Sequence, residues 1–331
     1  MCIKQSSATL ARVGLCVVPL LILTPTIAAE NGNYPERTIK MVIGFPAGQS
    51  SDVVARYYAQ KLSEELGQTV YVENRPGATG IIAHEYVKNA APDGYTILMT
   101  SGAPLAISPA LYKNISYDSA KDFSPIILTN TTPMFLATAV ETPVNNYAEM
   151  AAYLKERPGK VNYGSGGNGV TTHIVMEMLK EAGGLDLTHI PYKGAPAMMT
   201  DLIAGRVTFG FETSTAVLPQ ASGGRLKLLG VTSAERSSAA PDVPTLAEQG
   251  VEGFDVVTWA GIVAPAGVPE PIVTRLNTAL QKVLARDDVV AYLKSIGGEP
   301  AGGTPQDFGT FINSELATWG AAVKASGARL D

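Results

Sequence analysis

Residues 38–66 read TIKMVIGFPAGQSSDVVARYYAQKLSEEL, and this stretch decides the fold class. Thr38 to Phe45 is a short apolar run of the kind that forms a buried strand. Pro46 to Ser51 is a polar turn. From Asp52 to Leu66 the apolar residues recur at three- and four-residue spacing, which indicates a helix. A strand, a turn and a helix in this order predict an α/β unit.

The same alternation continues to the end of the chain. The expected strands are residues 38–45, 69–72, 95–100, 126–128, 135–140, 160–163, 187–190, 207–211, 226–232 and 253–264. The expected helices are residues 52–66, 80–90, 147–157, 170–182, 195–204, 270–285, 288–295 and 305–325. This order is typical of an α/β fold.

Two stretches suggest how the chain divides into lobes. The polar residues 129–133 predict a turn, and we expect the chain to cross there from a first lobe to a second. Residues 253–264 are long enough for a return strand, after which three helices would pack back on the first lobe. We therefore expect lobe 1 at residues 30–131 and 258–331, and lobe 2 at residues 132–257.

The first 29 residues have the features of a secretory signal peptide. Lys4 and Arg12 give a positive start, Val13 to Leu23 an apolar core, and Ala28 and Ala29 a small-residue cleavage site. The apolar run is about half of the roughly 20 residues that a membrane-spanning helix needs. We therefore expect cleavage near Ala28/Ala29 and release into the periplasm.

Cysteine content and charge exclude several classes of protein. Both cysteines, Cys2 and Cys16, lie within the expected signal, so the mature chain has no disulfide, thiolate metal site or cysteine nucleophile. Cys16 is a poor site for lipid attachment because Leu15 precedes it, where a small residue is needed. The formal net charge is −5, and removing the signal makes it more negative. Nucleic acid and anionic membrane surfaces are therefore unfavourable partners.

The most informative motifs are two loops of the same kind, residues 46–51 and residues 164–172. Each follows an expected strand and opens an expected helix. Backbone N–H groups at a helix start lack intrahelical partners and carry the positive end of the helix dipole, so small residues there let an anion approach. Facing each other across a cleft, the loops would hold a dicarboxylate, or one carboxylate and a polar group. The alternative is ordinary helix capping by Ser50, Ser51, Thr171 or Thr172.

Other functional patterns are incomplete. Residues 164–169 fit G-x-G-x-x-G, but Asp186 precedes its strand instead of ending it, and an exported protein does not usually meet NAD. His84 has Lys88 where a zinc-binding helix needs a second histidine. His173 lies one turn inside the helix after the second loop and is a candidate for orienting that loop. We identify no pair of carboxylates and no nucleophile with a base, and expect no cofactor, no metal and no catalytic residue.

Three aromatic residues are candidates for the walls of a cleft. Phe45 lies at the end of the first strand, Phe211 at the end of a strand in the second lobe, and Trp259 in the return strand. Ligand crevices of α/β proteins form at strand ends, which favours a binding role. Packing in the core is the alternative for each of them.

Seven segments, taken in order, carry a family resemblance. They are Ile43-Gly44-Phe45-Pro46-Ala47-Gly48 with Asp52 and Ala55-Arg56; Val72-Glu73-Asn74-Arg75-Pro76-Gly77-Ala78 with Gly80; Pro92-Asp93-Gly94-Tyr95-Thr96; Tyr163-Gly164-Ser165 with Gly169 and His173; Pro191-Tyr192-Lys193-Gly194; Pro241-Asp242-Val243-Pro244-Thr245-Leu246-Ala247-Glu248; and Trp259-Ala260-Gly261 with Ala264-Pro265-Ala266-Gly267. With these segments the chain resembles the Bug-type extracytoplasmic solute receptors of tripartite tricarboxylate transporters.

The resemblance implies a two-lobed periplasmic binding protein fold of type II with the ligand in a cleft between the lobes. The loop after the first strand and the glycine-rich turn of the second lobe would grip ligand carboxylates, partly through ordered water. On matching positions this implies Phe45, Ala47, Gly48, Ser50, Ser51 and Asp52, and in the second lobe Ser165, Gly166, Thr171 and His173. The chain departs from the usual pattern at Gln49, Val170 and Glu212, where glycine, serine and aspartate are common. We include Glu212, Phe211 and Trp259 among the candidate ligand-binding residues.

The sequence therefore predicts a non-catalytic receptor for a small organic carboxylate. Dicarboxylates, tricarboxylates, acidic amino acids and aromatic carboxylates all fit. The resemblance implies delivery of the ligand to integral-membrane permease subunits. Two alternatives remain open: an extracytoplasmic sensor subunit, and an exported hydrolase or lyase that uses the same cleft.

Overall fold

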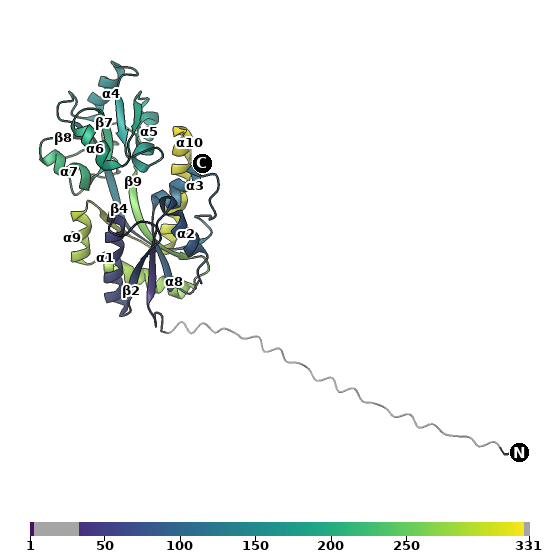
Figure 1. Ribbon diagram of the computed structural model, residues 1–331. Coiled ribbons are helices and arrows are strands. Elements are labelled where there is room, and N and C mark those ends of the chain that lie inside the picture. Colours follow the sequence, from purple (N-terminus) through teal and green to yellow (C-terminus); the bar gives the residue numbers. More distant parts are fainter. Residues whose placement is uncertain (3–32, 328–331) are drawn as a thin grey trace. The chain divides into compact units, whose positions relative to one another are not determined.

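The computed structural model describes residues 1–2 and 33–327, with the side chain of Ser50 excepted, and Figure 1 shows the arrangement of its elements. The expected signal peptide therefore lies almost wholly outside the described residues. The elements up to the first long strand are β1 (Ile39–Ile43), α1 (Ser50–Leu66), β2 (Val70–Asn74), η1 (Ala78–Gly80), α2 (Ile81–Lys88), β3 (Thr96–Ser101), η2 (Ala103–Ile107), α3 (Ser108–Leu111) and β4 (Phe123–Ala139).

The later elements continue the alternation of helices and strands. They are α4 (Tyr147–Lys155), β5 (Asn162–Ser165), α5 (Thr171–Gly183), β6 (Thr188–Pro191), α6 (Ala195–Ile203), β7 (Phe209–Thr213), α7 (Ser214–Ser222), β8 (Leu226–Val231), β9 (Val257–Pro265), α8 (Glu270–Leu284), α9 (Asp287–Ser295), β10 (Glu299–Gly302) and α10 (Pro305–Ser326).

The strands of the described chain are hydrogen-bonded in the order β2-β1-β3-β9-β4-β7-β5-β6, and β8 and β10 also pair with β4. β1 is parallel to β2 and β3, and β5 is parallel to β6 and β7. We call β1, β2, β3, β9, β10 and residues 123–133 of β4 the first strand group. Residues 134–139 of β4 together with β5 to β8 form the second strand group. Parallel strands with helices between them confirm the α/β fold class.

The predicted turn at residues 129–133 is wrong, because these residues form the middle of β4. Residues 128–133 pair with residues 261–257 of β9. The hydroxyl group of Thr129 has a backbone acceptor on β9, since its Oγ1 donates to the carbonyl of Ala260 at 2.9 Å. From β9, Thr258 Oγ1 donates to the carbonyl of Thr132, also at 2.9 Å. Threonine is β-branched and fits a strand well once its hydroxyl is satisfied, so polarity alone did not indicate a turn.

The chain therefore passes between the strand groups as a continuous strand, and β4 changes partners between Pro133 and Met134. The predicted lobe boundaries, at 131/132 and 257/258, lie close to this change. Residues from Asn33 onward form one compact unit, so the division into lobes stays a prediction.

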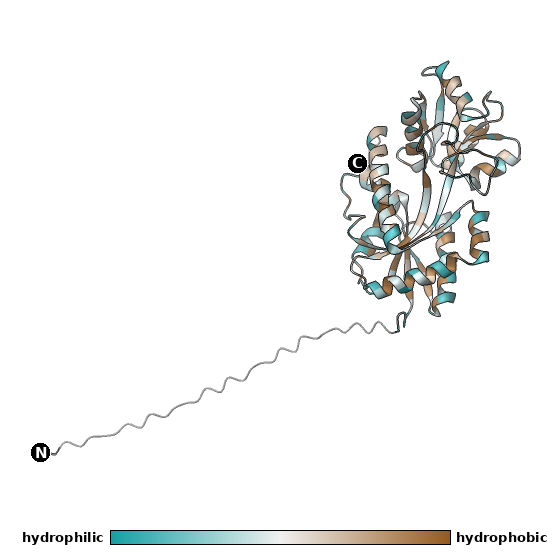
Figure 2. Cartoon of the chain, turned by 180° about the vertical axis from the view of Figure 1, so that it is seen from behind, coloured by the Kyte–Doolittle hydropathy of each residue, from teal (hydrophilic) through white to brown (hydrophobic). Residues whose placement is uncertain are grey.

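Alternate residues of the strands pack against helices on opposite faces. Ile39, Met41 and Ile43 of β1 pack in a core cluster with residues of α1, α8 and α9. Val42 points the other way, into a cluster with residues of α2 and α10. In Figure 2 apolar and hydrophilic residues alternate along the helices, as expected where one face is buried.

Helix α10 does not pack only on the first strand group, although we expected all three C-terminal helices to pack on the first lobe. Phe308 and Ile312, in its first half, pack with residues of the first strand group. Trp319 and Val323, in its second half, pack in the cluster that contains α5 and the second strand group. One helix thus contacts both groups, whereas α8 and α9 pack with the first.

Helix α7 and strand β10 were not predicted from the sequence. Helix α7 contains Pro219 and no charged residue, so its sequence lacks an amphipathic period. Strand β10 is only four residues long and contains Pro300. None of the helices in the described part has the length and hydropathy needed to cross a bilayer.

Candidate functional site

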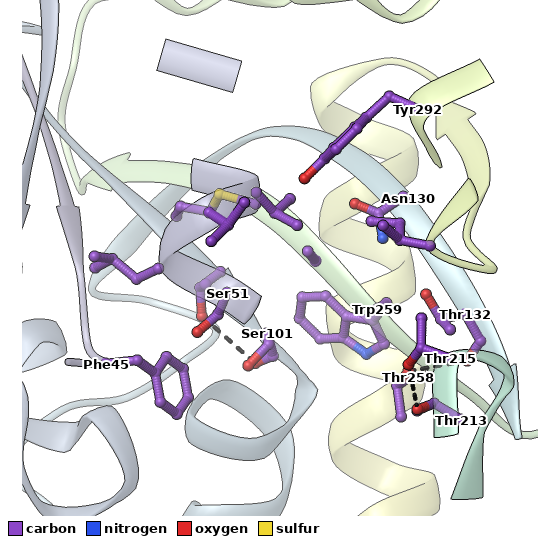
Figure 3. Close-up of a pocket in the computed structure, with 17 residues that line it drawn as sticks. Phe45, Ser51, Ser101, Asn130, Thr132, Thr213, Thr215, Thr258, Trp259 and Tyr292 are labelled. Atoms are coloured by element: carbon purple, nitrogen blue, oxygen red, sulfur yellow. Dashed lines mark hydrogen bonds between the residues drawn. The ribbon is translucent and has the colours of Figure 1, made fainter. Parts of the chain in front are cut away.

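A cavity of about 490 Å³, which we call the main cavity, lies among the strand ends of the first group and the start of α7. Figure 3 shows its lining. The lining residues are Ile43, Phe45, Ser51, Val53, Val54, Met99, Thr100, Ser101, Asn130, Thr132, Thr213, Thr215, Thr258, Trp259, Ala260, Tyr292 and Ile296. They come from β1, α1, β3, β4, the β7–α7 junction, β9 and α9.

The polar side chains of this lining are all neutral. Hydroxyl groups follow three strand ends, with Ser51 after β1, Ser101 at the end of β3 and Thr213 at the end of β7. Asn130 adds an amide from the middle of β4. Among the described lining residues none carries a charge, so any charged ligand group would be met by hydroxyls, amides and backbone dipoles.

Two helices, α1 and α7, begin at this cavity. The N-cap of α1 is Gln49 and that of α7 is Thr213, and neither side chain makes a capping hydrogen bond. Thr213 Oγ1 lies 3.1 Å from Thr215 Oγ1 instead. The first N–H groups of both helices therefore carry the positive end of a dipole without a cap from the N-cap side chain, which suits an anion.

Apolar side chains form the rest of the wall. Phe45, Trp259 and Tyr292 provide rings, and Tyr292 is stacked on Tyr57 with 4.0 Å between ring centroids. Trp259 lies centrally among the side chains drawn in Figure 3. Its indole N–H donates to Glu315 Oε2 at 2.6 Å, so the ring offers only carbon to the cavity. The main cavity thus combines neutral donors with an apolar wall.

Asp52 organises the first loop instead of facing the cavity. Its carboxylate accepts hydrogen bonds from Gly48 N–H at 2.9 Å and from Arg56 Nε at 3.0 Å through Oδ2, and from Asn74 Nδ2 at 2.7 Å through Oδ1. Burial raises the pKa of Asp52, but these hydrogen bonds outweigh burial and bring the pKa to about 2. Asn74 also donates to the carbonyl of Phe45, which fixes the start of the loop.

The other predicted residues of the first loop lie in different places. Phe45 and Ser51 line the main cavity. Ala47 and Gly48 are exposed and outside the lining. Ser50 begins α1, and its side chain lies outside the described part of the chain.

The glycine-rich second loop packs over a stack of rings. His173 and His189 are stacked with centroids 3.9 Å apart, and Tyr163 lies against His189 at 4.8 Å. Gly169 N–H donates to His173 Nδ1 at 3.0 Å, so His173 orients this loop. Helix α5 begins after Val170, whose side chain cannot cap it. None of Ser165, Gly166 and His173 is in the lining of the main cavity.

Ser165 is paired with a histidine that the sequence did not place beside it. Its Oγ lies 2.7 Å from His189 Nε2 and donates to the carbonyl of Gly167 at 2.9 Å. The two residues are 24 positions apart, which is why no pair was identified from spacing. Ser165 has no exposed surface, so the arrangement holds the loop and offers no accessible nucleophile.

Thr171 reaches a smaller cavity of about 190 Å³ beside the main one. Ser101, Thr258 and Trp259 line both cavities, and Trp319 closes the smaller one. Of the second loop, Thr171 is thus the residue found among the described linings of these two cavities.

Phe211 and Glu212 lie behind the cavity. Phe211 has no exposed surface and packs with Leu136 and Tyr163, in agreement with the core-packing alternative. Glu212 is 6% exposed and precedes the cavity residue Thr213. Burial raises the pKa of Glu212 to about 7, although the N–H of Thr213 donates to its carboxylate and opposes this. Glu212 is therefore a titratable group directly behind the lining.

His84 controls the hydroxyl of Thr100. Its Nδ1 lies 2.9 Å from the carbonyl of Gly80 and its Nε2 2.8 Å from Thr100 Oγ1. Burial lowers the pKa of His84 to about 4, so the ring is neutral. A carbonyl only accepts, so Nδ1 carries the proton and Nε2 accepts from the Thr100 hydroxyl.

Sequence reasoning missed most of the polar lining. Thr100, Ser101, Asn130, Thr132, Thr213, Thr215, Thr258 and Tyr292 were not predicted. A usable signal was present in the sequence, because pairs of hydroxyl residues recur near strand ends. Thr100-Ser101 ends β3, Thr213-Ser214 spans the junction of β7 and α7, and Ser50-Ser51 follows β1. Among the described residues, no cluster of histidine, cysteine, aspartate and glutamate is arranged to bind a metal ion.

The family model described as "Tripartite tricarboxylate transporter family receptor" matches residues 54–328. The chain belongs to this receptor family. BugT of Bordetella pertussis is 35% identical over 319 residues, which cover 96% of this chain and 98% of BugT. A UPF0065 protein from the tcbD-tcbE intergenic region of Pseudomonas sp. (strain P51) is 36% identical over 316 residues, 94% of each chain. The Bug-type resemblance is confirmed.

Solved structures agree with this assignment. An R. palustris protein with adipate is 36% identical, with a TM-score of 0.76 over 90% of this chain and 100% of that one. The periplasmic binding protein BugD is 36% identical, with a TM-score of 0.72 over 89% of this chain and 99% of BugD. MatC from Rhodopseudomonas palustris with bound malate is 30% identical, with a TM-score of 0.71 over 88% of this chain and 100% of MatC. These similarities confirm the periplasmic binding protein fold.

Members of this tripartite tricarboxylate transporter receptor family bind solutes outside the cytoplasm and are not enzymes. The chain is accordingly a solute-binding receptor, and the hydrolase or lyase alternative is set aside.

Proposed function

We propose that this receptor captures a small organic carboxylate in the main cavity. The observation that carries the proposal is the meeting of two helix starts, α1 and α7, at a cavity whose described lining has no charged side chain. The positive ends of the dipoles favour an anion there. Ser51, Thr213 and Asn130 supply neutral donors beside them. A cavity of about 490 Å³ is of the size that small-molecule sites have.

We further propose that the ligand has an apolar body between its polar ends. Phe45, Trp259, Tyr292, Met99 and Ile296 would contact hydrocarbon, and the described lining has no charged group to meet several carboxylates. A linear dicarboxylate such as adipate, or an aromatic carboxylate, fits this lining better than a highly charged tricarboxylate. Adipate and malate are the molecules in the two similar structures described above.

We also propose a route for the ligand, which the family name supports. The expected signal peptide would export the chain to the periplasm, where the receptor would collect the carboxylate and deliver it to integral-membrane permease subunits. Residues 133–134 of β4 and Val257 at the start of β9 would serve as hinges between two lobes that close on the ligand.

A thermal-shift screen of adipate, malate, citrate, glutamate and benzoate against the mature protein tests the proposal, followed by titration calorimetry. At a hundredfold excess over Kd, a ligand should stabilise the protein by about 2.7 kcal/mol. We expect adipate or benzoate to give the largest shift, and mass spectrometry to recover the ligand unchanged. Stabilisation by citrate alone would contradict the proposed apolar body, and the absence of any carboxylate effect would contradict the proposal as a whole.

A further inference from the structure

The two tryptophans of the chain share one carboxylate oxygen. Trp259 Nε1 donates to Glu315 Oε2 at 2.6 Å, and Trp319 Nε1 donates to the same oxygen at 2.8 Å. Trp259 lies in β9 at the wall of the main cavity, whereas Glu315 and Trp319 lie one turn apart on α10. A single oxygen atom therefore connects a cavity side chain to a helix outside the main cavity.

Both indole N–H groups depend on this acceptor. Trp259 is 3% exposed and Trp319 is 2% exposed, so water has little access to either ring. An indole N–H can only donate, and a buried donor without an acceptor is costly. Gly102 packs against the same edge of the ring, since a Cβ at that position would lie 3.0 Å from Trp259 Nε1. The ring edge is thus held by Gly102 and Glu315 together.

Trp319, at the other end of this pair of hydrogen bonds, packs with residues of the second strand group. Trp319 packs in the cluster that contains Ile174 and Val175 of α5. Trp259 packs edge-to-face on Phe308, which lies in the first half of α10. The carboxylate of Glu315 therefore lies where the side chains of the cavity wall meet those of the second strand group.

We propose that Glu315 is a positioning residue of the ligand site, which fixes the orientation of the Trp259 ring at the cavity wall and connects that ring to Trp319. Its effect on ligand affinity rests on the proposed function, whereas the shared hydrogen bond does not. Removing the acceptor should let the Trp259 ring turn towards another hydrogen-bond partner and spoil the apolar wall.

The charge of Glu315 gives a direct readout of the shared bond. Burial raises the pKa of Glu315, both indole donors lower it, and the nearby Asp255 raises it. Because the chain has two tryptophans, a proton–nitrogen correlation spectrum contains two indole cross-peaks, and Trp319→Phe assigns them. Both cross-peaks should titrate together with one midpoint above the ordinary glutamate value of 4.5. Two separate midpoints, or no titration in the folded protein, would overturn the proposal without any variant.

Variants then separate positioning from general stability. Glu315→Gln keeps an oxygen acceptor and should abolish the shared titration while leaving the Kd for adipate within about twofold. Glu315→Leu should move both cross-peaks and raise the Kd for adipate roughly three- to tenfold, the factor that one lost hydrogen bond gives. Thr318→Ala, an exposed position on the same helix, is the control and should change neither.

The positioning role of Glu315 and the proposed function can be contradicted independently of each other. If Glu315→Leu folds with unchanged cross-peaks and unchanged affinity, the positioning role is wrong. If adipate and the other carboxylates do not bind the wild type while both indoles titrate with Glu315, the proposed function fails and the shared hydrogen bond stands.

Discussion

The loops at residues 46–51 and 164–172 are built alike, yet only the first borders the main cavity. In each, a side chain in the first turn of the following helix accepts the N–H of a glycine four residues earlier. Asp52 Oδ2 accepts from Gly48 N at 2.9 Å, and His173 Nδ1 accepts from Gly169 N at 3.0 Å. The place expected for the second loop is taken by the start of α7.

In the second strand group, the strand whose end reaches the main cavity is β7 and not β5. β7, which leads into α7, is the neighbour of β4, whereas β5, which leads into the glycine-rich loop, lies one strand further out. The ends of β1, β3 and β7 reach the main cavity, whereas no residue of β5 or of the glycine-rich loop lines it. The chemistry of a strand–helix turn can be read from its residues, but its destination depends on where its strand lies in the sheet.

The largest effects are expected from removing Asp52 or His173, the side chains that accept the N–H groups of Gly48 and Gly169. Asp52→Ala should lower the free energy of unfolding by about 2–3 kcal/mol, because it removes hydrogen bonds to a charged group, and should raise the Kd of the cavity ligand about tenfold or more. His173→Ala should cost about 1–2 kcal/mol of stability but change the Kd by less than about threefold. Chemical denaturation and calorimetry measure both effects. Asp52→Asn keeps one acceptor oxygen, so its free energy of unfolding and its Kd should lie between those of the wild type and Asp52→Ala. Equal losses of affinity in Asp52→Ala and His173→Ala would contradict the expectation that only the first loop supports the ligand site.

The two loops should also differ in their sensitivity to acid. Burial, and then the neighbouring His173, lowers the pKa of His189 from 6.5 to about 4. A histidine kept neutral in the folded state contributes stability above pH 6.5, and this contribution is lost as the pH falls from 6.5 to about 4. The pKa of Asp52 is about 2 in the folded chain against 3.8, so its contribution is lost only between pH 3.8 and about 2.

Amide hydrogen exchange can follow the two loops separately. The N–H of Gly169 should lose protection at milder acidity than the N–H of Gly48, and His189→Gln should remove the difference above pH 4. His84, whose pKa burial also lowers to about 4, serves as an internal comparison in the first strand group. If the N–H groups of Gly48 and Gly169 lost protection at the same pH, the two loops would not be held by separate titrating groups.

Hydroxyl deletions test which loop touches the ligand. Ser51 lines the main cavity, whereas Thr171 lines only the smaller one. Ser51→Ala should therefore raise the Kd roughly three- to tenfold. Thr171→Val keeps the shape of the side chain and should change the Kd by less than about twofold. The reverse order would place the ligand nearer the glycine-rich loop.

Glycine substitutions should give the smallest effects. Gly48 has a φ of +85°, so Gly48→Ala should cost about 1 kcal/mol of stability through backbone strain. A Cβ on Gly166 would lie 3.4 Å from the nitrogen of Ala195, an ordinary contact, so Gly166→Ala should cost less than about 0.5 kcal/mol. Thermal unfolding of both variants measures the difference, and a larger loss for Gly166→Ala would contradict it.

Local patterns carried most of the secondary structure and part of the site. The period of residues 52–66 predicted α1 because its apolar face packs on β1, and the aromatic candidates Phe45 and Trp259 do line the main cavity. Residues 129–133 were predicted wrongly because hydrogen bonds between their polar groups and β9, such as those of the Thr129 hydroxyl and the Thr132 carbonyl, cannot be recognised in a single sequence. Helix α7 was not predicted because Pro219 and uncharged residues obscure its helical period. For the same reason Thr213 and Thr215, at its start, were not predicted as cavity residues.

Long-range pairing accounts for the rest. Asp52 was assigned to the ligand, but its carboxylate is occupied by Arg56 and Asn74, and Asn74 lies 22 positions away. The link between Trp259 and Glu315 spans 56 positions. Neither separation has a periodic signature, so only the folded chain reveals which side chains meet.

A crystal structure with the carboxylate that binds most tightly would locate the ligand site of this receptor. We expect the ligand in the main cavity, with one carboxylate at the starts of α1 and α7 near Ser51 and Thr213, and its apolar part against the ring of Trp259. A ligand held by the glycine-rich loop around Gly166, or one whose carboxylates are paired with arginine or lysine side chains, would contradict it.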